Sequence, residues 1–390
     1  MKIAQVISTG PFAWATGGPS RVIYELSKAL VKRGHDITIL TTDMYTPRQR
    51  WVSNNDQDFT DGIRILRFKY VSNCLAWKRK TILSPGLISY LRKHINEFDI
   101  VHLQELISIQ AVITSKYCTK NHIPYVLTTH GSIPWLNEQK LLNMAFKFMW
   151  GSNILMNAIA ITCLTDFEAE LCRRMGINAE KIKVIPNGVA LSEFDNLPAR
   201  GEFRKKHDLS GDVKIVLYIG RIHRTKGLGF LMRAFERLLR NQRYIMLVIV
   251  GPDDGYMRVL KKLAGNLKIV SNVLFTGPLY GREKLEAYVD ADVFVTPCFS
   301  GFPLTFVESC ACGVPVITTE NGDRLEWLDN QAGFITPYNE EKLSESLGHL
   351  LSDNQAIQAL GNMGRLLVRE RFNWPKIAAD IEDVYLRVVK

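Results

Sequence analysis

Residues 213–241, VKIVLYIGRIHRTKGLGFLMRAFERLLRN, pass from an apolar strand through a basic loop into an amphipathic helix. The apolar start, Val213–Ile219, predicts the strand, and the end, Gly229–Asn241, predicts the helix. The loop between them is bounded by glycines and carries the cations Arg221 and Lys226. In an open parallel sheet, ligands bind in the loops that follow strands and open helices. This stretch therefore predicts an α/β domain whose basic loop either binds an anion or, as the alternative, is simply solvated.

The same strand-then-helix pattern recurs on both sides of this stretch, which predicts two doubly wound parallel sheets of the Rossmann type. Further strands in the second half are expected at Ile245–Val250, Val273–Phe275, Val293–Thr296 and Val314–Ile317. Strands in the first half are expected at Ile3–Ile7, Ile37–Leu40, Ile63–Phe68, Ile100–Leu103, Tyr125–Thr128 and Ile159–Cys163. The clearest other helices are Ser20–Arg33, Arg282–Val289, Phe306–Cys312 and Trp374–Val389.

A chain of 390 residues is too long for one ordinary core. Turn residues gather between Asn187 and Arg200, which predicts the domain boundary there. We expect an N-terminal domain over 1–195, a C-terminal domain over 196–372 and a final helix over 373–390. The content of 46% hydrophobic and 23% charged residues is that of a globular enzyme.

The seven cysteines show no C-x-x-C pair and no Cys/His spacing typical of a metal site. They are predicted to be buried free thiols in a reducing compartment. Met1-Lys2 leads directly into the first expected strand, so we see no secretory signal, and no apolar run reaches the length of a membrane span. We expect a protein that is cytoplasmic or peripheral on the inner face of a membrane.

The net charge of +10 is uneven, since residues 1–190 hold 23 Lys+Arg against 14 Asp+Glu. Nucleic acid, an anionic membrane or an acidic acceptor would each explain this excess. Stretches that mix cations with apolar side chains, at Leu75–Lys80, Leu87–Ile95 and Leu141–Met156, fit an interfacial helix on an anionic membrane. The alternative is that their apolar residues pack in the domain core.

Two further loops carry candidate chemistry. Gly17-Gly18 precedes the first helix, where glycines either let the backbone approach a ligand or, as the alternative, form a plain turn. Pro297–Glu308 runs from a strand through a Gly-containing loop into a helix, whose first amides would point at an anion. Glu308 follows about one turn later, placed to accept two vicinal hydroxyls, and a carboxylate in this apolar context needs a partner. Neither a G-x-G-x-x-G fingerprint nor a P-loop is present.

Taken together, these motifs resemble those of the family-four retaining glycosyltransferases, whose architecture of two Rossmann-like domains facing across a cleft is called GT-B. The resemblance covers essentially the whole chain. It rests on Gly17-Gly18, His130-Gly131, Ile185–Val189, Gly220-Arg221 with Lys226-Gly227, and Gly301–Leu304 with Glu308. Phe372-Asn373-Trp374 resembles the family's return crossing, after which the last helix packs on the N-terminal domain.

The resemblance implies a role for each of these residues. Arg221 and Lys226 would neutralise the donor diphosphate, assisted by amides in the segment Gly301, Phe302, Pro303, Leu304 and Thr305. Glu308 would bind the ribose, and Gly17 and Gly18 would approach the phosphates from the other domain. Gly277, Pro278 and Leu279 would contact the base, and His130 would face the transferred sugar.

One position departs from the family pattern, since Ser300 stands where the family usually has a Glu that holds the transferred sugar. This leaves the identity of the sugar open. Asp290 and Asp292 match the D-x-D metal motif of a different glycosyltransferase fold, but they lie between an expected helix and an expected strand. We interpret them as structural and expect neither a metal ion nor a cofactor.

The expected reaction transfers a sugar from a nucleotide diphosphate sugar to a saccharide acceptor, in the synthesis of lipid-linked glycans or surface polysaccharides. Fixed cations would stabilise the charge on the departing diphosphate. The resemblance implies retention of configuration without a covalent intermediate. A sugar-nucleotide epimerase on the same architecture is an alternative. A nucleic-acid-binding protein is a weaker one, because the basic residues are scattered and form no known nucleic-acid motif.

Overall fold

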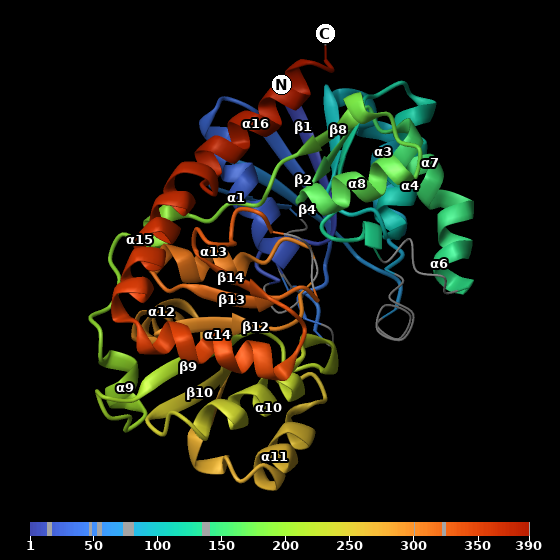
Figure 1. The fold of residues 1–390 in the computed structure, drawn as a ribbon. Helices are drawn as coiled ribbons and strands as arrows, with labels where there is room; N and C mark the ends of the chain where they lie inside the picture. Colours follow the sequence, from blue (N-terminus) through green and yellow to red (C-terminus); the bar gives the residue numbers. More distant parts are fainter. Residues whose placement is uncertain are drawn as a thin grey trace. The chain divides into compact units, whose positions relative to one another are not determined.

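The computed structural model describes residues 1–13, 18–46, 49–52, 57–72, 82–134, 141–299, 301–321 and 325–389. Contacts divide the chain into two compact units. Unit 1 holds Met1–Gly188 together with Trp374–Lys390, and unit 2 holds Val189–Asn373. Each unit has its own sheet (Figure 1).

Unit 1 contains an 8-stranded sheet in the order β3-β4-β2-β1-β5-β6-β7-β8. Its strands are β1 (Lys2–Thr9), β2 (Asp36–Thr42), β3 (Gln57–Thr60), β4 (Ile63–Phe68), β5 (Ile100–Leu103), β6 (Tyr125–Thr128), β7 (Ala160–Cys163) and β8 (Ile182–Val184). All neighbours are parallel except β3 and β4. The inner strands are buried throughout, as expected for a sheet with helices on both faces.

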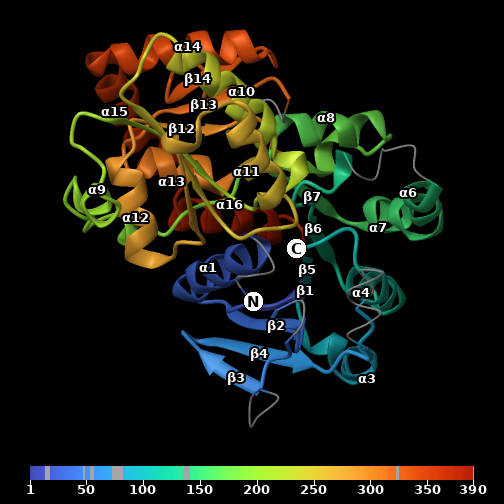
Figure 2. The ribbon, with the colours of Figure 1, turned by 90° about the horizontal axis from the view of Figure 1, so that it is seen from below.

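The helices of unit 1 are α1 (Gly18–Lys32), α3 (Pro85–His94), α4 (Ile109–Lys120), α6 (Leu141–Phe146), α7 (Ser152–Asn157), α8 (Asp166–Arg174) and α16 (Trp374–Leu386). A π-helical segment, η3 (Lys147–Gly151), joins α6 to α7. The last helix, α16, packs on α1 (Figure 2). Glu382 on α16 pairs with Arg33 and lies 2.7 Å from His35 Nε2, which fastens the end of the chain to unit 1.

Unit 2 contains a parallel 6-stranded sheet in the order β11-β10-β9-β12-β13-β14. Its strands are β9 (Lys214–Ile219), β10 (Ile245–Val250), β11 (Val273–Gly277), β12 (Val293–Thr296), β13 (Val316–Thr319) and β14 (Gly333–Thr336). Its α-helices are α9 (Glu202–Lys206), α10 (Leu228–Leu239), α11 (Met257–Asn266), α12 (Gly281–Asp290), α13 (Leu304–Ala311), α14 (Glu340–Ser352) and α15 (Asn354–Arg371).

Two doubly wound sheets are thus present, as the sequence predicted. The sequence did not predict β3, β8 and β14, which are short strands at the edges of the sheets. These strands lack the long apolar run that marks a central strand. The expected strand Val314–Ile317 begins later, at Val316, since Gly313, Val314 and Pro315 form its approach.

Each sheet has a point where the direction of winding reverses. In unit 2 this switch point lies between β9 and β12, and in unit 1 it lies between β1 and β5. Helices that follow such neighbouring strands leave on opposite faces of the sheet, so a crevice opens beyond the strand ends. Both candidate loops of unit 2, after β9 and after β12, lie at its switch point.

At the carboxyl ends of the strands beside this switch point, backbone atoms pack so closely that a side chain does not fit. Gly251 follows β10 with φ at +145°, and a Cβ there would lie 1.9 Å from the carbonyl oxygen of Gly220. The Gly220 amide donates to Val250 O at 3.0 Å, and the Gly251 amide donates to Gly277 O at 2.9 Å. The ends of three strands are therefore held together where no side chain fits.

We predict that Gly251→Ala lowers the free energy of unfolding of unit 2 by about 3 kcal/mol or more, through overpacking and backbone strain. The control is Gly265→Ala in α11, where an added Cβ meets no atom within 4 Å. That change should leave stability equal or raise it by about 0.5–1 kcal/mol. Thermal and urea unfolding of both variants measures the difference, and equal midpoints would contradict the close approach.

Candidate functional site

The loop after β9 brings two cations to the switch point of unit 2. It continues through Gly220 into a short 3₁₀ turn, Arg224–Lys226, and then into α10. Gly227 ends this turn with φ at +71°, and a Cβ there would lie 2.7 Å from the Sγ of Cys298. The cationic loop therefore packs against the chain that leaves β12.

The two cations of this loop have different environments. Arg221 is exposed and its Nη1 lies 2.7 Å from Asp254 Oδ2, in the loop after β10. Lys226 is half-buried and forms no ion pair or side-chain hydrogen bond within the described ranges. Burial lowers the pKa of Lys226, and the charge of Arg221 lowers it further. A cation in this setting favours an incoming anion, which would restore its pKa.

The start of α13 supplies backbone donors at the same switch point. Gly301 has φ at +69°, and Phe302 is buried between Trp327 and Phe372. The helix begins at Leu304, two residues earlier than predicted, and among the described residues no side chain is seen to cap its first turn, since the N-cap residue is Pro303. The amides of Leu304 and Thr305 are therefore left for water or a ligand, at the end of the helix that favours an anion.

Glu308 lies in the second turn of α13 and has the partners that its apolar context requires. Its Oε1 accepts from Lys284 Nζ at 2.8 Å, and its Oε2 lies 3.1 Å from the hydroxyl of Tyr288. Both partners come from α12. Burial, together with the charge of Glu308, raises the pKa of Tyr288 well above its usual range, so this hydroxyl stays protonated and donates. The carboxylate of Glu308 is thus fixed in place.

The end of β11 presents an open backbone surface. Gly277 has φ at +78°, and a Cβ at this position would meet no atom within 4 Å. Pro278 is exposed and Leu279 is half-buried. This segment could therefore receive a flat ring against backbone and apolar atoms.

In unit 1, Gly18 is the exposed first residue of α1, at the switch point after β1. His130 follows β6 with φ at +45°, a left-handed conformation that is uncommon outside glycine. The His130 Nε2 lies 2.9 Å from Gln104 Oε1, in the chain that leaves β5. Burial lowers the pKa of His130 to about 4, so the imidazole is neutral at pH 7.

A buried carboxylate braces the turn that holds His130. Glu168 on α8 is fully buried, and its Oε2 accepts from Thr129 Oγ1 at 2.9 Å and from the Leu164 amide at 3.0 Å. Burial raises the pKa of Glu168. The unusual conformation of His130 is thus fixed by a neighbouring helix.

Several of these partners were missed by the sequence reading: Gly251, Asp254, Lys284, Tyr288, Gln104 and Glu168. The Gly251-Pro252 turn directly after a buried strand was a usable signal. The others are ordinary helix or loop residues that acquire a role only through contacts. Gly17 and Ser300 lie outside the described residues.

Asp290 and Asp292 lie at the end of α12 and before β12, where basic groups and backbone amides occupy them. Asp290 accepts from the amides of Gly201 and Arg204. Asp292 accepts from the Ile215 amide at 2.8 Å and pairs with the basic side chains Arg200, Arg204 and Lys214. Both carboxylates therefore join the start of unit 2 to its sheet.

Six cysteines have free, buried thiols, and Cys74 lies outside the described residues. Within the described ranges, we find no group of three or more His, Cys, Asp or Glu side chains arranged to hold a metal ion. In the same part of the chain, no helix has both the length and the apolar content to cross a membrane.

Comparison with known proteins connects both units to one class of enzyme. Residues 16–193 match the description "Glycosyltransferase Family 4", and residues 199–366 match "Glycosyl transferases group 1". A D-inositol 3-phosphate glycosyltransferase of Xylanimonas cellulosilytica is 27% identical, over 96% of this chain and 92% of that protein. A GDP-mannose-dependent phosphatidylinositol monomannoside mannosyltransferase of Mycobacterium tuberculosis is 31% identical, over 53% of this chain and 56% of that protein.

The fold has relatives among solved structures. Anabaena HepE in complex with UDP-glucose superimposes with a TM-score of 0.77 at 18% identity, over 99% of this chain and 100% of that one. At this identity the likeness concerns the fold alone. The two family matches, the two Rossmann-like units and the cationic loop at the switch point agree, and the chain belongs to the family-four glycosyltransferases of GT-B architecture.

Proposed function

We propose that this enzyme moves a sugar from a nucleotide diphosphate sugar to an acceptor hydroxyl with retention of configuration and without a metal ion. The observation that carries the proposal is the half-buried Lys226, which lies beside Arg221. In the described part of the chain, Lys226 has no acidic partner. A diphosphate supplies the missing negative charge. The uncapped start of α13 adds backbone donors to the same switch point.

Different residues of unit 2 bind different parts of the donor. Arg221 and Lys226 neutralise the diphosphate, and the charge that builds up as the glycosidic bond breaks is stabilised by the same cations. Glu308, fixed by Lys284 and Tyr288, accepts the two ribose hydroxyls. Gly277, Pro278 and Leu279 receive the base. These fixed charges replace the metal ion that other glycosyltransferases use.

The experiment that tests the proposal is a hydrolysis screen against UDP-, GDP- and ADP-sugars, each with and without a chelator. We expect slow hydrolysis of one donor without acceptor, at a rate that chelation leaves unchanged. NMR of the released sugar at early times reports the retained anomeric configuration. No hydrolysis of any donor would count against the proposal, and activity restored only by magnesium or manganese would refute metal independence.

The acceptor is proposed to be a lipid-linked or surface saccharide, which places the enzyme at a membrane surface. Large apolar side chains are exposed on α6, η3 and α7: Met144 (53%), Phe148 (92%), Met149 (55%) and Met156 (54%). In the same segment, Ile154 and Leu155 are buried in the core. The core packing that was the alternative therefore accounts for only part of this stretch.

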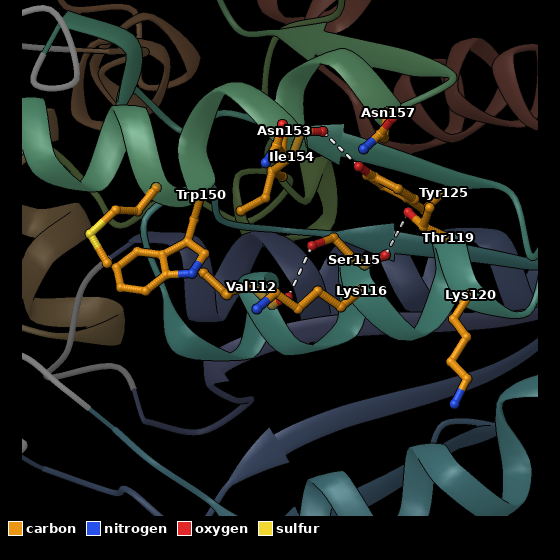
Figure 3. A pocket seen from close by; sticks show the side chains of 11 residues that line it. Val112, Ser115, Lys116, Thr119, Lys120, Tyr125, Trp150, Asn153, Ile154 and Asn157 are labelled. Atoms are coloured by element: carbon orange, nitrogen blue, oxygen red, sulfur yellow. Dashed lines mark hydrogen bonds between the residues drawn. The ribbon is translucent and has the colours of Figure 1, made fainter.

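A pocket of about 440 Å³ adjoins these exposed side chains, between α4 and α7 (Figure 3). Trp150 and Met149 line it together with the exposed cations Lys116 and Lys120. Apolar side chains next to cations suit the boundary between anionic headgroups and acyl chains. The stretch Leu87–Ile95 does not share this character, because Leu87, Leu91 and Ile95 are buried, and Leu75–Lys80 lies outside the described residues.

We predict that Arg221→Ala and Lys226→Ala each lower kcat/KM by about tenfold or more, since hydrogen bonds to charged groups contribute about 1.5–3 kcal/mol. The matched control is Arg224→Ala, an exposed cation in the same turn. Its kcat/KM should stay within about twofold of the wild type. Equal losses in all three variants would mean that general positive charge, and not a diphosphate contact, is at work.

The lowered pKa of Lys226 gives a second prediction, on pH dependence. A lysine with a lowered pKa loses its charge at a lower pH than a free one, so kcat/KM should fall on the alkaline side as Lys226 deprotonates. Lys226→Arg keeps the charge throughout this range and should move the alkaline limb upward. An alkaline limb identical in both enzymes would assign it to another group.

We predict that the protein sediments with anionic vesicles at low salt and is released at high salt. Phe148→Ser should weaken this partition by about tenfold, because burying a Phe side chain contributes about 1.5–3 kcal/mol. The control is Tyr244→Ser, which removes an aromatic residue that is 75% exposed in unit 2. Failure of the wild type to bind anionic vesicles at low salt would remove the membrane proposal.

A further inference from the structure

A buried chain of polar side chains crosses the core of unit 1 and ends at His130. It links α16 with β1, β5, β6 and β7, and every member is buried, with at most 5% exposure. Its members are Gln5, His102, Gln104, Thr128, Thr162 and Tyr385. Gln5 and His102 are direct neighbours in the β1–β5 register, and Tyr385 reaches both of them from α16.

The hydrogen bonds between these buried polar side chains follow one donor-to-acceptor direction. Gln104 Nε2 donates to Gln5 Oε1 at 2.6 Å, and Gln5 Nε2 donates to the Tyr385 oxygen at 3.3 Å. The single hydroxyl proton of Tyr385 is then left for His102 Nδ1, 2.6 Å away. Because each amide has a donor end and an acceptor end, and a buried hydroxyl proton needs an acceptor, this arrangement satisfies all of these groups.

The rest of the chain follows the same sense. Burial lowers the pKa of His102 to about 3, so this imidazole carries one proton. With Nδ1 accepting from Tyr385, that proton lies on Nε2, which is 2.7 Å from Thr128 Oγ1. Thr128 contacts Thr162, whose hydroxyl donates to the carbonyl of Leu127 at 3.4 Å. The chain therefore ends on an acceptor that cannot reverse.

His130 stands at the opposite end, where the sense of the chain fixes its protonation. The amide nitrogen of Gln104 is already used toward Gln5, so its Oε1 faces His130 Nε2 as an acceptor. His130 must then carry its proton on Nε2. Its Nδ1 forms no hydrogen bond within the described ranges, and the His130 residue is only half-buried, so Nδ1 keeps a lone pair that a ligand could use.

We propose that Tyr385 and Gln104 are positioning residues that hold His130 in the Nε2–H tautomer, so that Nδ1 accepts a hydrogen bond from a hydroxyl of the transferred sugar. This inference rests on the proposed function for the identity of that hydroxyl. The assignment of the tautomer rests on the hydrogen bonds alone. The return of the C-terminal helix to unit 1 thereby acquires a role in the chemistry besides its packing.

The charged and titratable groups around His130 agree with a neutral ring. His102 of β5 lies beyond Gln104 in the chain, and its proximity disfavours a second positive charge. Glu168 of α8 braces the turn through Thr129. Glu105, which follows Gln104, has a pKa raised by burial, and its Oε2 accepts from Ser8 Oγ at 2.5 Å. In the described part of the chain, neither carboxylate forms a hydrogen bond or ion pair with the His130 ring.

The first test reads the tautomer without using activity. The protein is labelled with ¹⁵N-histidine, and the signal of His130 among the eight histidines is assigned with His130→Gln. Long-range ¹H–¹⁵N correlation spectra separate the two tautomers. We expect a protonated Nε2 and an unprotonated Nδ1 in the wild type at pH 7. A protonated Nδ1 would overturn the proposal.

The second test removes the hydroxyl that orders the chain. Tyr385→Phe should populate both tautomers of His130 and lower kcat for donor hydrolysis about two- to tenfold with little change in KM. The matched control is Tyr125→Phe, a buried tyrosine of β6 whose hydroxyl donates to Ile154 O at 2.7 Å outside the chain. An unaltered His130 spectrum in Tyr385→Phe would overturn the positioning role.

The third test uses Gln104→Glu, which places a carboxylate, an acceptor only, against His130 Nε2. The negative charge should raise the pKa of His130 from about 4, so the acid limb of kcat moves to higher pH. An acid limb that does not move would contradict the contact. If the wild type hydrolyses no nucleotide sugar, the proposed function fails, while the tautomer and its dependence on Tyr385 are still decided by the spectra.

Discussion

The close packing at two glycines, Gly251 after β10 and Gly227 in the loop after β9, is the constraint on which unit 2 depends. A Cβ on Gly251 would overlap the carbonyl of Gly220, and a Cβ on Gly227 would overlap Cys298. Because these positions have no side chain, the loops after β9 and β12 can meet above the switch point. The cations of one loop and the helix start of the other then share a small region of the surface.

Two buried carboxylates of unit 2 have cationic partners, whereas the half-buried cation at this region has no acidic partner among the described residues. Glu308 is held by Lys284, and Asp292 is held by Arg200, Arg204 and Lys214. In the described part of the chain, Lys226 has no such partner, and burial and Arg221 both lower its pKa. Burying a cation without a partner lowers the stability of the folded state. An anionic ligand bound at this site would compensate for that loss.

In unit 1, a chain of buried, uncharged polar side chains joined by hydrogen bonds positions the candidate site residue His130. Its members come from four strands, the loop after β5 and α16, and the hydroxyl of Tyr385 is contributed by this helix at the opposite end of the sequence from β1. A satisfied network of this kind fixes one arrangement of side chains, because an unpaired member would be costly in the core. The conformation of His130 is set by this chain from one side and by Glu168 from the other.

The sequence by itself determined the two parallel sheets, most strand positions and the loops at the switch point of unit 2, because periodicity and glycine placement are local signals. It also singled out Glu308 as a carboxylate in need of a partner. Only the tertiary structure decided that the partners are Lys284 and Tyr288, that Asp254 pairs with Arg221, and that Tyr385 reaches His102. These contacts join residues far apart in the chain, and such pairs carry no local pattern. The sequence did not predict the edge strands β3, β8 and β14 for a related reason. They are strands because they pair with a neighbouring strand, and their own composition does not mark them as such.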